Sequence, residues 1–222
     1  MTEFKSYVDH NLKNFKRERI YFENEKNLNH DIQIFIFSFV GFTPRTYEEF
    51  REAVNLWITD ESEALKKYGH ISYWNTQNVT NMSHLFEDLD YFNEPLNWDT
   101  KSVTNMSFMF MNAESFNQPL NWNTKNVTDM QNMFYGTESF NQPLNFNTEN
   151  VTNMGCMFSI AISFNQPLNF TNTEKVIDMS KMFILAESFN QHLNFDTKNV
   201  TNMEGMFSDA KSFNQPLNFN TE

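Results

Sequence analysis

The stretch W-N-T-K-N-V-T-D-M-Q-N-M-F-Y-G-T-E-S-F-N-Q-P-L-N, residues 122–145, decides the fold because the chain repeats it. Blocks of this pattern begin at Trp74, Trp98, Trp122, Phe146, Phe170 and Phe195, and a stub begins at Phe219. The period is 24 residues, except that one residue inserted near Thr171 lengthens a single block to 25. A fixed period in this range is the signature of a repeat solenoid, because one such unit buries its apolar face only against copies of itself.

The apolar positions of the block carry two local patterns. Met130, Met133 and Phe134 are spaced i, i+3, i+4, which predicts one face of a short helical turn. Residues 144–146 place one Asn between Leu and Phe, which is the alternation of a strand. We therefore expect an α/β repeat solenoid of leucine-rich-repeat-like right-handed coils, with one parallel sheet built from the P-L-N-(W/F) segments.

Asn forms two of the polar columns. An Asn amide both donates and accepts hydrogen bonds, so stacked Asn side chains can bond along the array, or they can bond the backbone of turns. The columns are Asn117, Asn141, Asn165, Asn190 and Asn214 in F-N-Q, and Asn97, Asn121, Asn145, Asn169, Asn194 and Asn218 after Leu.

The first 73 residues differ from the repeats, so we divide the chain into a helical N-terminal region, 1–73, and a solenoid, 74–222. Thr46 and Glu49 form a capping box that predicts a helix over 47–58. Asp60 begins a second helix, which Gly69 ends. A solenoid exposes its first core layer unless something covers it, and we expect these helices to be the cap.

Two further helices are expected upstream. Residues 31–40, D-I-Q-I-F-I-F-S-F-V, carry an apolar stripe and resemble the start of an F-box, which would imply an adaptor of a ubiquitin ligase. The alternative is a packed N-terminal helix. Residues 4–15 carry a second stripe with basic residues nearby, which fits a cap helix or a helix that binds a partner or a membrane.

The unit at 122–145 resembles the BspA-like surface-protein repeat, a leucine-rich-repeat variant also described as a mycoplasma lipoprotein domain of unknown function. The resemblance covers about two thirds of the chain and recurs in six blocks. It implies a binding or structural surface, linked in secreted or lipid-anchored bacterial members to adhesion. It implies no catalytic residue.

The N-terminus departs from the bacterial pattern. Residues 1–10 are charged and contain neither an apolar core nor a lipobox Cys, so no secretory signal is expected. The longest apolar run, 32–42, is about half the length that a bilayer span needs. Cys156 is the only cysteine, which excludes an intrachain disulfide. A cytoplasmic or virion location is expected, with no transmembrane segment.

The charge of the repeats excludes one class of partner. Residues 74–222 contain 6 of the 16 Lys and Arg and 16 of the 28 Asp and Glu, which gives 6 − 16 = −10 of the net −12. An acidic surface with no basic stripe repels phosphate backbones, so no nucleic-acid partner is expected.

Catalytic patterns are missing from the sequence. None of the five His lies at ligand spacing from another, and Cys156 occupies a variable column rather than a position beside a base. The Met columns have the helical spacing of core residues rather than of a soft-metal site. With five Gly in the chain, no phosphate loop is present. We expect no enzyme activity, no cofactor and no metal.

Two functions remain from different classes. The first is a protein–protein interaction scaffold that uses the columns where the blocks vary; Met111, Tyr135, Ile160, Ile184 and Leu185 would form an exposed apolar strip, unless they tuck under the next coil. The second is a structural or virion-associated assembly protein. A weaker alternative is an ice- or glycan-binding array that uses the Thr columns.

The last coil is expected to lack a cover, because the sequence reaches Glu222 four residues into a seventh block. An uncovered apolar layer is a site for assembly. We expect end contacts with another subunit or a partner protein, or a longer array. The residues expected to be uncovered are Met203, Met206, Phe207, Phe213, Leu217 and Phe219.

Overall fold

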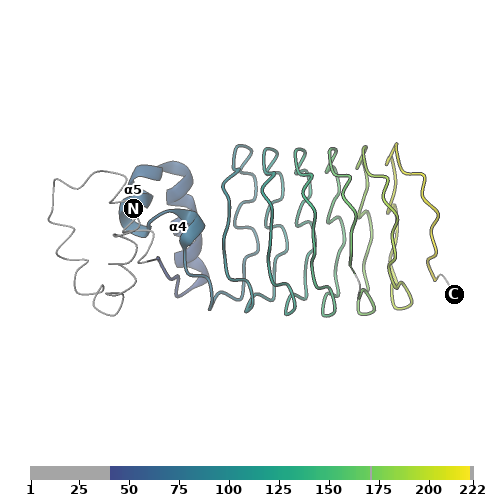
Figure 1. The fold of residues 1–222 in the computed structure, drawn as a ribbon, viewed down its shortest axis with the longest axis horizontal. Helices are drawn as coiled ribbons and strands as arrows, with labels where there is room; N and C mark the ends of the chain where they lie inside the picture. The colour runs from purple at the N-terminus through teal and green to yellow at the C-terminus, as the bar shows by residue number, and fades with distance from the viewer. Residues whose placement is uncertain (1–40, 171, 221–222) are drawn as a thin grey trace, which may run out of the picture.

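The computed structural model describes residues 41–170 and 172–220. Two helices, α4 (Tyr47–Thr59) and α5 (Glu61–Tyr68), are followed by a short 3-10 helix, η1 (Ile71–Tyr73). A row of stacked coils then runs away from the helices to the end of the described chain (Figure 1). The helices expected within residues 4–15 and 31–40, with the F-box resemblance, lie outside the described residues.

The two helices predicted from their caps are confirmed. The hydroxyl of Thr46 accepts a hydrogen bond from the Glu49 N–H at 3.1 Å, and α4 begins at the next residue. Asp60 caps α5 in the same way, accepting from the Glu63 N–H at 3.0 Å. The second helix ends at Gly69, whose φ of 73° favours glycine.

Helix α4 covers the apolar end of the first coil, residues 74–97. The Phe50 ring lies 6.1 Å from Trp74 and 5.1 Å from Trp98, measured between ring centroids. The Tyr47 hydroxyl donates to the Ser83 carbonyl at 2.6 Å. Burying these aromatic faces stabilises the end of the stack, because they would otherwise be exposed to water.

The coils are built from consecutive β-turns. In the coil 98–121, Met109 donates to the Met106 carbonyl at 3.3 Å, and Ala113 donates to Phe110 at 3.0 Å. The third residues of these two turns, Phe108 and Asn112, have φ of 59° and 56°, as type II turns require. A left-handed residue in each turn interrupts helical hydrogen bonding, so the helical turn predicted for M-x-x-M-F is wrong.

The predicted parallel sheet is also wrong, and with it the α/β, leucine-rich-repeat-like class, because the residues that the structure describes contain no strand. Side chains do alternate along the P-L-N-(W/F) segments, where Leu120 is buried and Asn121 exposed. However, the proline has no N–H. The N–H of the Asn two residues earlier, such as Asn141, donates to the Asn117 side chain at 3.0 Å. One isolated parallel bridge, between Leu144 and Leu168, joins these segments, and elsewhere side-chain bonds take the place of the backbone ladder that a sheet requires.

The two Asn columns behave differently. In the F-N-Q column, the side-chain oxygen of Asn117 accepts from the Asn141 N–H and from the Gln142 side chain, both at 3.0 Å. This column therefore bonds along the stack. The Asn column after Leu, represented by Asn145, is exposed, and its side chains form no hydrogen bond within the described residues.

Backbone hydrogen bonds join neighbouring coils along the M-x-x-M-F segments instead. Every second N–H of one coil donates to a carbonyl of the next coil, and a Thr N–H returns a bond in the opposite direction; Thr128 donates to Thr104 at 2.8 Å. Between the second and third coils the donors are Met106, Phe108, Phe110 and Asn112, and the acceptors are Asp129, Gln131, Met133 and Tyr135, at 2.7–3.0 Å. The backbone of a turn-built coil is satisfied in this way.

Two ladders of stacked Phe rings fill the core. Consecutive rings lie 5.3–5.7 Å apart in one ladder and 5.9–6.0 Å apart in the other, measured between centroids. The first ladder is Phe86, Phe110, Phe134, Phe158, Phe183 and Phe207, and the second is Phe92, Phe116, Phe140, Phe164, Phe189 and Phe213. The Met columns are buried beside them, as core residues.

The inserted residue leaves later coils in frame, as predicted. Asp178, which follows the insertion, pairs in parallel with Asn153 on one side and Asn202 on the other. Phe189 stacks at 5.9 Å on the preceding ring of its ladder and at 5.9 Å on the following one. Thr171, near which the extra residue is inserted, is outside the described residues.

Candidate protein-interaction site

The predicted apolar strip comes together in neighbouring coils but is mostly half-buried. Met111 and Tyr135 occupy the same column of neighbouring coils. The residue after Met111, Asn112, donates its N–H to the Tyr135 carbonyl at 2.7 Å, so the two coils are joined at this column. Met111, Tyr135, Ile160 and Ile184 are half-buried, and Leu185 is 37% exposed. Ser159 is buried between Tyr135 and Ile184 in the same column.

Ile160 and Leu185 adopt left-handed backbone conformations, with φ of 58° and 59°. A β-branched residue rarely adopts positive φ, so this turn favours Gly or Asn and does not account for Ile160. The sequence carried the signal for this turn, since Gly136 and Asn112 occupy the same column. The same applies to Cys156, with φ of 56°, whose column contains Gly205.

The residues expected at the open end are more exposed than their counterparts one coil earlier. Leu217 is 42% exposed, whereas Leu193 is 2% exposed. Met206 is buried, and Met203, Phe207, Phe213 and Phe219 are half-buried. No described residue lies beyond this coil to cover it.

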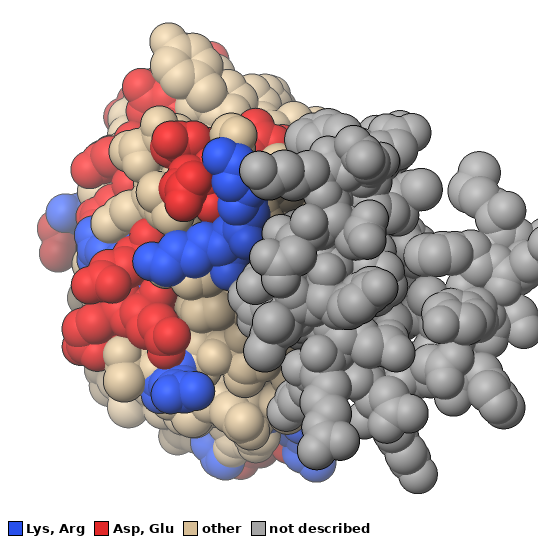
Figure 2. Space-filling view, turned by 90° about the vertical axis from the view of Figure 1, so that its left-hand side faces the viewer, with Lys and Arg blue, Asp and Glu red and all other residues tan. Residues whose placement is uncertain are grey.

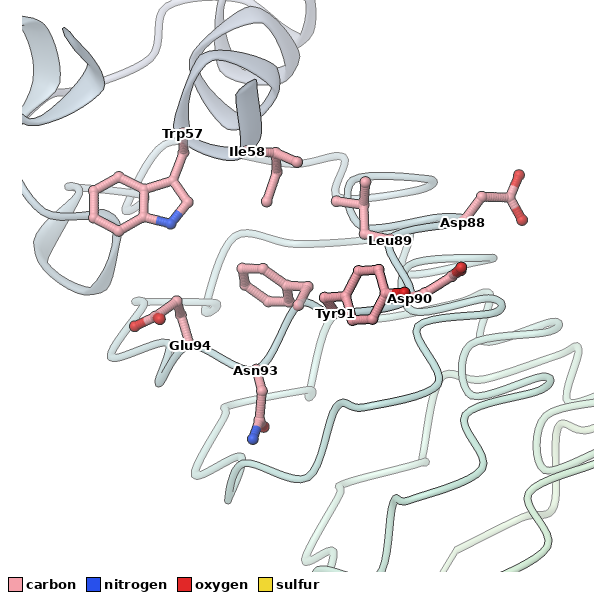
Figure 3. Close-up of a pocket in the computed structure, with 9 residues that line it drawn as sticks. Trp57, Ile58, Asp88, Leu89, Asp90, Tyr91, Asn93 and Glu94 are labelled. Carbon is pink, nitrogen blue, oxygen red and sulfur yellow. The ribbon is translucent and has the colours of Figure 1, made fainter. Parts of the chain in front are cut away.

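A pocket that the sequence did not predict lies between the end of α4 and the first coil. Its volume is about 430 Å³, and it is lined by Trp57, Ile58 and residues 88–94. Figure 3 shows Trp57 and Ile58 pointing from the helix toward the first coil, with Asp88 and Asp90 at one end and Glu94 at the other. We call this feature the junction pocket.

The junction pocket is acidic. Asp88, Asp90 and Glu94 line it, and neither Lys nor Arg does. The block 74–97 contains these three carboxylates, Glu87 and no basic residue, a formal charge of −4, whereas each of the other five blocks has one more acidic than basic residue, −1. Acidic side chains gather on much of the described surface at this end of the molecule, broken by a band of basic ones (Figure 2).

The pocket is also where the first block departs from the repeat. Where the first block has Leu89, the other five blocks have Ala or Thr. They have Ser at the position of Tyr91 and Gln at the position of Glu94. Two departures have packing reasons: Leu89 is half-buried against the core, and Glu94 has no preceding coil, whereas Gln118 donates to Asn93 at 3.0–3.2 Å. The third departure, Tyr91, has no packing reason, because its side chain is 92% exposed.

The remaining reactive groups of the described residues form no catalytic arrangement. Burial raises the pKa of the Cys156 thiol, which disfavours the nucleophilic thiolate. His84 contacts Glu87 at 2.8 Å and stacks on Phe108 at 4.6 Å. Within residues 41–170 and 172–220, no three His, Cys, Asp or Glu are grouped so as to hold a metal ion. Neither described helix has the length and apolar character needed to cross a bilayer.

The fold and the junction pocket define a repeat protein of stacked, turn-built coils with a helical cap. The family described as Mycoplasma protein of unknown function, DUF285, matches residues 58–145 and again residues 144–222. Because these matches cover more than half of the 222 residues, the chain belongs to this family. Comparisons with curated proteins and with solved structures gave no match.

Proposed function

We propose that the chain is a non-enzymatic protein–protein interaction scaffold whose binding site is the junction pocket. The observation that carries this proposal is Tyr91, which is 92% exposed beside the junction pocket and replaces the Ser of the other five blocks. Tyr and Trp are enriched at the centres of protein interfaces, because they combine large apolar area with a polar tip.

The repeat array supports this role through its rigidity. Coils joined by backbone hydrogen bonds in both directions, with rings stacked through the core, hold surface residues in fixed positions. A preorganised surface loses little conformational entropy when it binds. The pocket itself lies between two rigid elements, α4 and the first coil.

The BspA-like resemblance of the repeat unit agrees with a binding role, and the DUF285 match is compatible with it. We carry over from that resemblance only the class of function, a surface that recognises another molecule. A cytoplasmic or virion location is part of the proposal, and fractionation of the source cells and particles tests it.

Affinity capture with matched variants tests the scaffold proposal. The full chain, immobilised, is exposed to a lysate of the source, alongside Tyr91→Ser, which installs the residue of the other blocks. Ser139→Tyr is the control, because it adds an exposed Tyr at the same column of a coil that lacks the pocket. We expect proteins that bind the wild type and the control but not Tyr91→Ser. Identical proteins on all three would refute the proposal.

An assembly role is the second candidate function, and the exposed Leu217 favours it. The apolar face of the coil 195–220 would accept a second subunit, a partner protein or a further coil. Sedimentation velocity over a range of concentrations tests this candidate. Association that grows with concentration and is lost in Leu217→Asn supports it, and a concentration-independent monomer refutes self-assembly.

A further inference from the structure

We propose that the junction pocket binds a protein segment in which an apolar residue is flanked by Lys or Arg. This inference rests on the proposed function, because it names the partner chemistry of the same site. The apolar residue would contact the middle of the pocket, and the cationic residues would meet the carboxylates at its ends.

The charges around the pocket favour a cationic guest. Asp88, Asp90 and Glu94 form no ion pair within the described residues, although Asp88 accepts a hydrogen bond from the Asn112 side chain at 2.8 Å. Some carboxylates of the later coils pair with lysines, as Glu174 does with Lys198 at 2.8 Å. The three pocket carboxylates therefore concentrate negative potential that a Lys or Arg would neutralise.

Helix α4 adds to this potential. It is 13 residues long and ends at Thr59, beside the pocket residues Trp57 and Ile58. The C-terminus of a helix carries partial negative charge, which a nearby Lys or Arg stabilises. The last turn of α4 contains no basic residue. A guest cation would supply the missing charge.

The apolar lining fits the rest of such a segment. Trp57 and Phe92 are buried and line the pocket, while Tyr91 and Ile58 are exposed to a guest, Ile58 by 41%. Lys and Arg lay their aliphatic stems along apolar surface and keep the charge in water. The face of an exposed Tyr also attracts a cation.

Other guests fit less well. Phosphate groups and acidic peptides would meet three carboxylates with no basic residue to hold them. An entirely apolar segment would remove water from those carboxylates and leave them unpaired, which is unfavourable. Residues 11–20, N-L-K-N-F-K-R-E-R-I, share the proposed chemistry, so a guest from the chain itself is an alternative that must be distinguished.

Fluorescence anisotropy with defined peptides tests the inference on the full chain. The probes are labelled ten-residue peptides in which Leu alternates with Arg or with Glu, and a third peptide with the sequence of residues 11–20. We expect the Leu-Arg peptide to bind, to weaken as salt rises, and to bind at least about tenfold more tightly than the Leu-Glu peptide. Equal binding of the two would overturn the inference.

The matched variants locate the binding. Tyr91→Ser with Glu94→Gln restores the repeat residues at both positions, so it should fold, and thermal unfolding checks that it does. We expect it to weaken Leu-Arg binding by about tenfold. The controls Glu138→Gln and Ser139→Tyr remove one charge or add one ring elsewhere, and should leave binding unchanged. Equal weakening in the controls would overturn the inference.

The outcomes separate this inference from the scaffold proposal. Tyr91-dependent capture of proteins without Leu-Arg binding would refute the partner chemistry and leave the scaffold proposal standing. Leu-Arg binding without Tyr91-dependent capture would refute the scaffold proposal. Tighter binding by the 11–20 peptide than by the Leu-Arg peptide, lost in the double variant, would overturn the assignment to a partner and assign the pocket to the chain's own segment.

Discussion

Replacing Phe140 with Ala should uncouple the two halves of the array. The Phe140 ring is buried and lies 4.4 Å from Phe134, 6.0 Å from Phe116 and 5.9 Å from Phe164, measured between centroids. Truncating a buried Phe to Ala costs about 3–5 kcal/mol. Loss of three ring contacts places this substitution toward about 5 kcal/mol, since aromatic pairs contribute beyond their buried area.

The effect on cooperativity is the sharper part of this prediction. Each coil contacts only its neighbours, so weakening the third coil lets the coils after it unfold while those before it remain folded. The four Trp of the chain, Trp57, Trp74, Trp98 and Trp122, all precede Phe140 and lie in α4 and the first three coils. Tryptophan fluorescence therefore reports the capped half, whereas circular dichroism reports the whole chain.

A urea titration followed by both signals gives the measurement. In the wild type the two transitions should coincide, and in Phe140→Ala the dichroism should be partly lost at lower urea than the fluorescence. Asn145→Ala is the control, because the Asn145 side chain is exposed and makes no hydrogen bond; it should change stability by less than about 0.5 kcal/mol. Coincident transitions in Phe140→Ala, or equal shifts in both variants, would refute the reasoning.

Asn112→Ala is not a suitable control, although Asn112 lies in a column that varies among the blocks. Asn112 has φ of 56° and donates from its side chain to Asp88 at 2.8 Å. Ala tolerates this left-handed conformation poorly, at a cost of about 1–2 kcal/mol. We therefore expect Asn112→Ala to cause a measurable loss of stability.

Three further predictions concern single positions. Lys181→Asn should stabilise the folded chain by about 0.5–1 kcal/mol, because the exposed Lys181 has φ of 54° and Asn accepts that conformation better. The control Lys125→Asn, at a residue with ordinary φ, should not stabilise it, and thermal unfolding of the two variants gives the comparison. Gly136→Ala should destabilise by about 2 kcal/mol, since φ is 64° and the new Cβ would lie 2.5 Å from a side-chain oxygen; Gly155→Ala, with contacts of 3.3 Å or more, should cost less in the same denaturant assay. The Cys156 thiol, whose raised pKa keeps it protonated at higher pH than a free thiol, should react with a disulfide reagent at pH 8 more slowly than N-acetylcysteine; an equal or faster rate would contradict this.

The sequence predicts the core well because burial follows residue type at each column. Val127, Met130, Phe134 and Leu144 are all buried, as their columns indicated. The helices α4 and α5 are predicted equally well, because a capping residue acts on the N–H groups two or three residues away. Both inferences depend on local chemistry alone.

The backbone path of the coils is harder to predict. Two backbone paths are compatible with the i, i+3, i+4 spacing of M-x-x-M-F. A helix places these side chains on one face, and so does a series of turns in which alternate N–H groups bond the next coil. The distinguishing signal is the Gly, Asn or Asp at the left-handed positions, such as Asn132 and Gly136. This signal is weak in any one block, because Lys181 and Ile160 occupy the same columns elsewhere.

The candidate site is missed for a different reason. The apolar strip at Met111 and Tyr135 was predicted from columns that vary among all the blocks. The junction pocket instead depends on one block that differs from the other five. Tyr91 and Glu94 are visible in the sequence, but their meaning depends on α4 lying across the first coil. That arrangement is tertiary, and no spacing within the repeat indicates it.

The reciprocal hydrogen bonds between coils have an evolutionary consequence. Every coil uses the same donor and acceptor positions, so the two sides of an inner coil such as 122–145 are complementary, and either side fits the matching side of any other coil. Unequal recombination between repeats could then delete or duplicate a whole unit without leaving mismatched partners at the new joint. The array could lengthen or shorten among relatives while the cap and the first coil, where the sequence is unique, stayed unchanged.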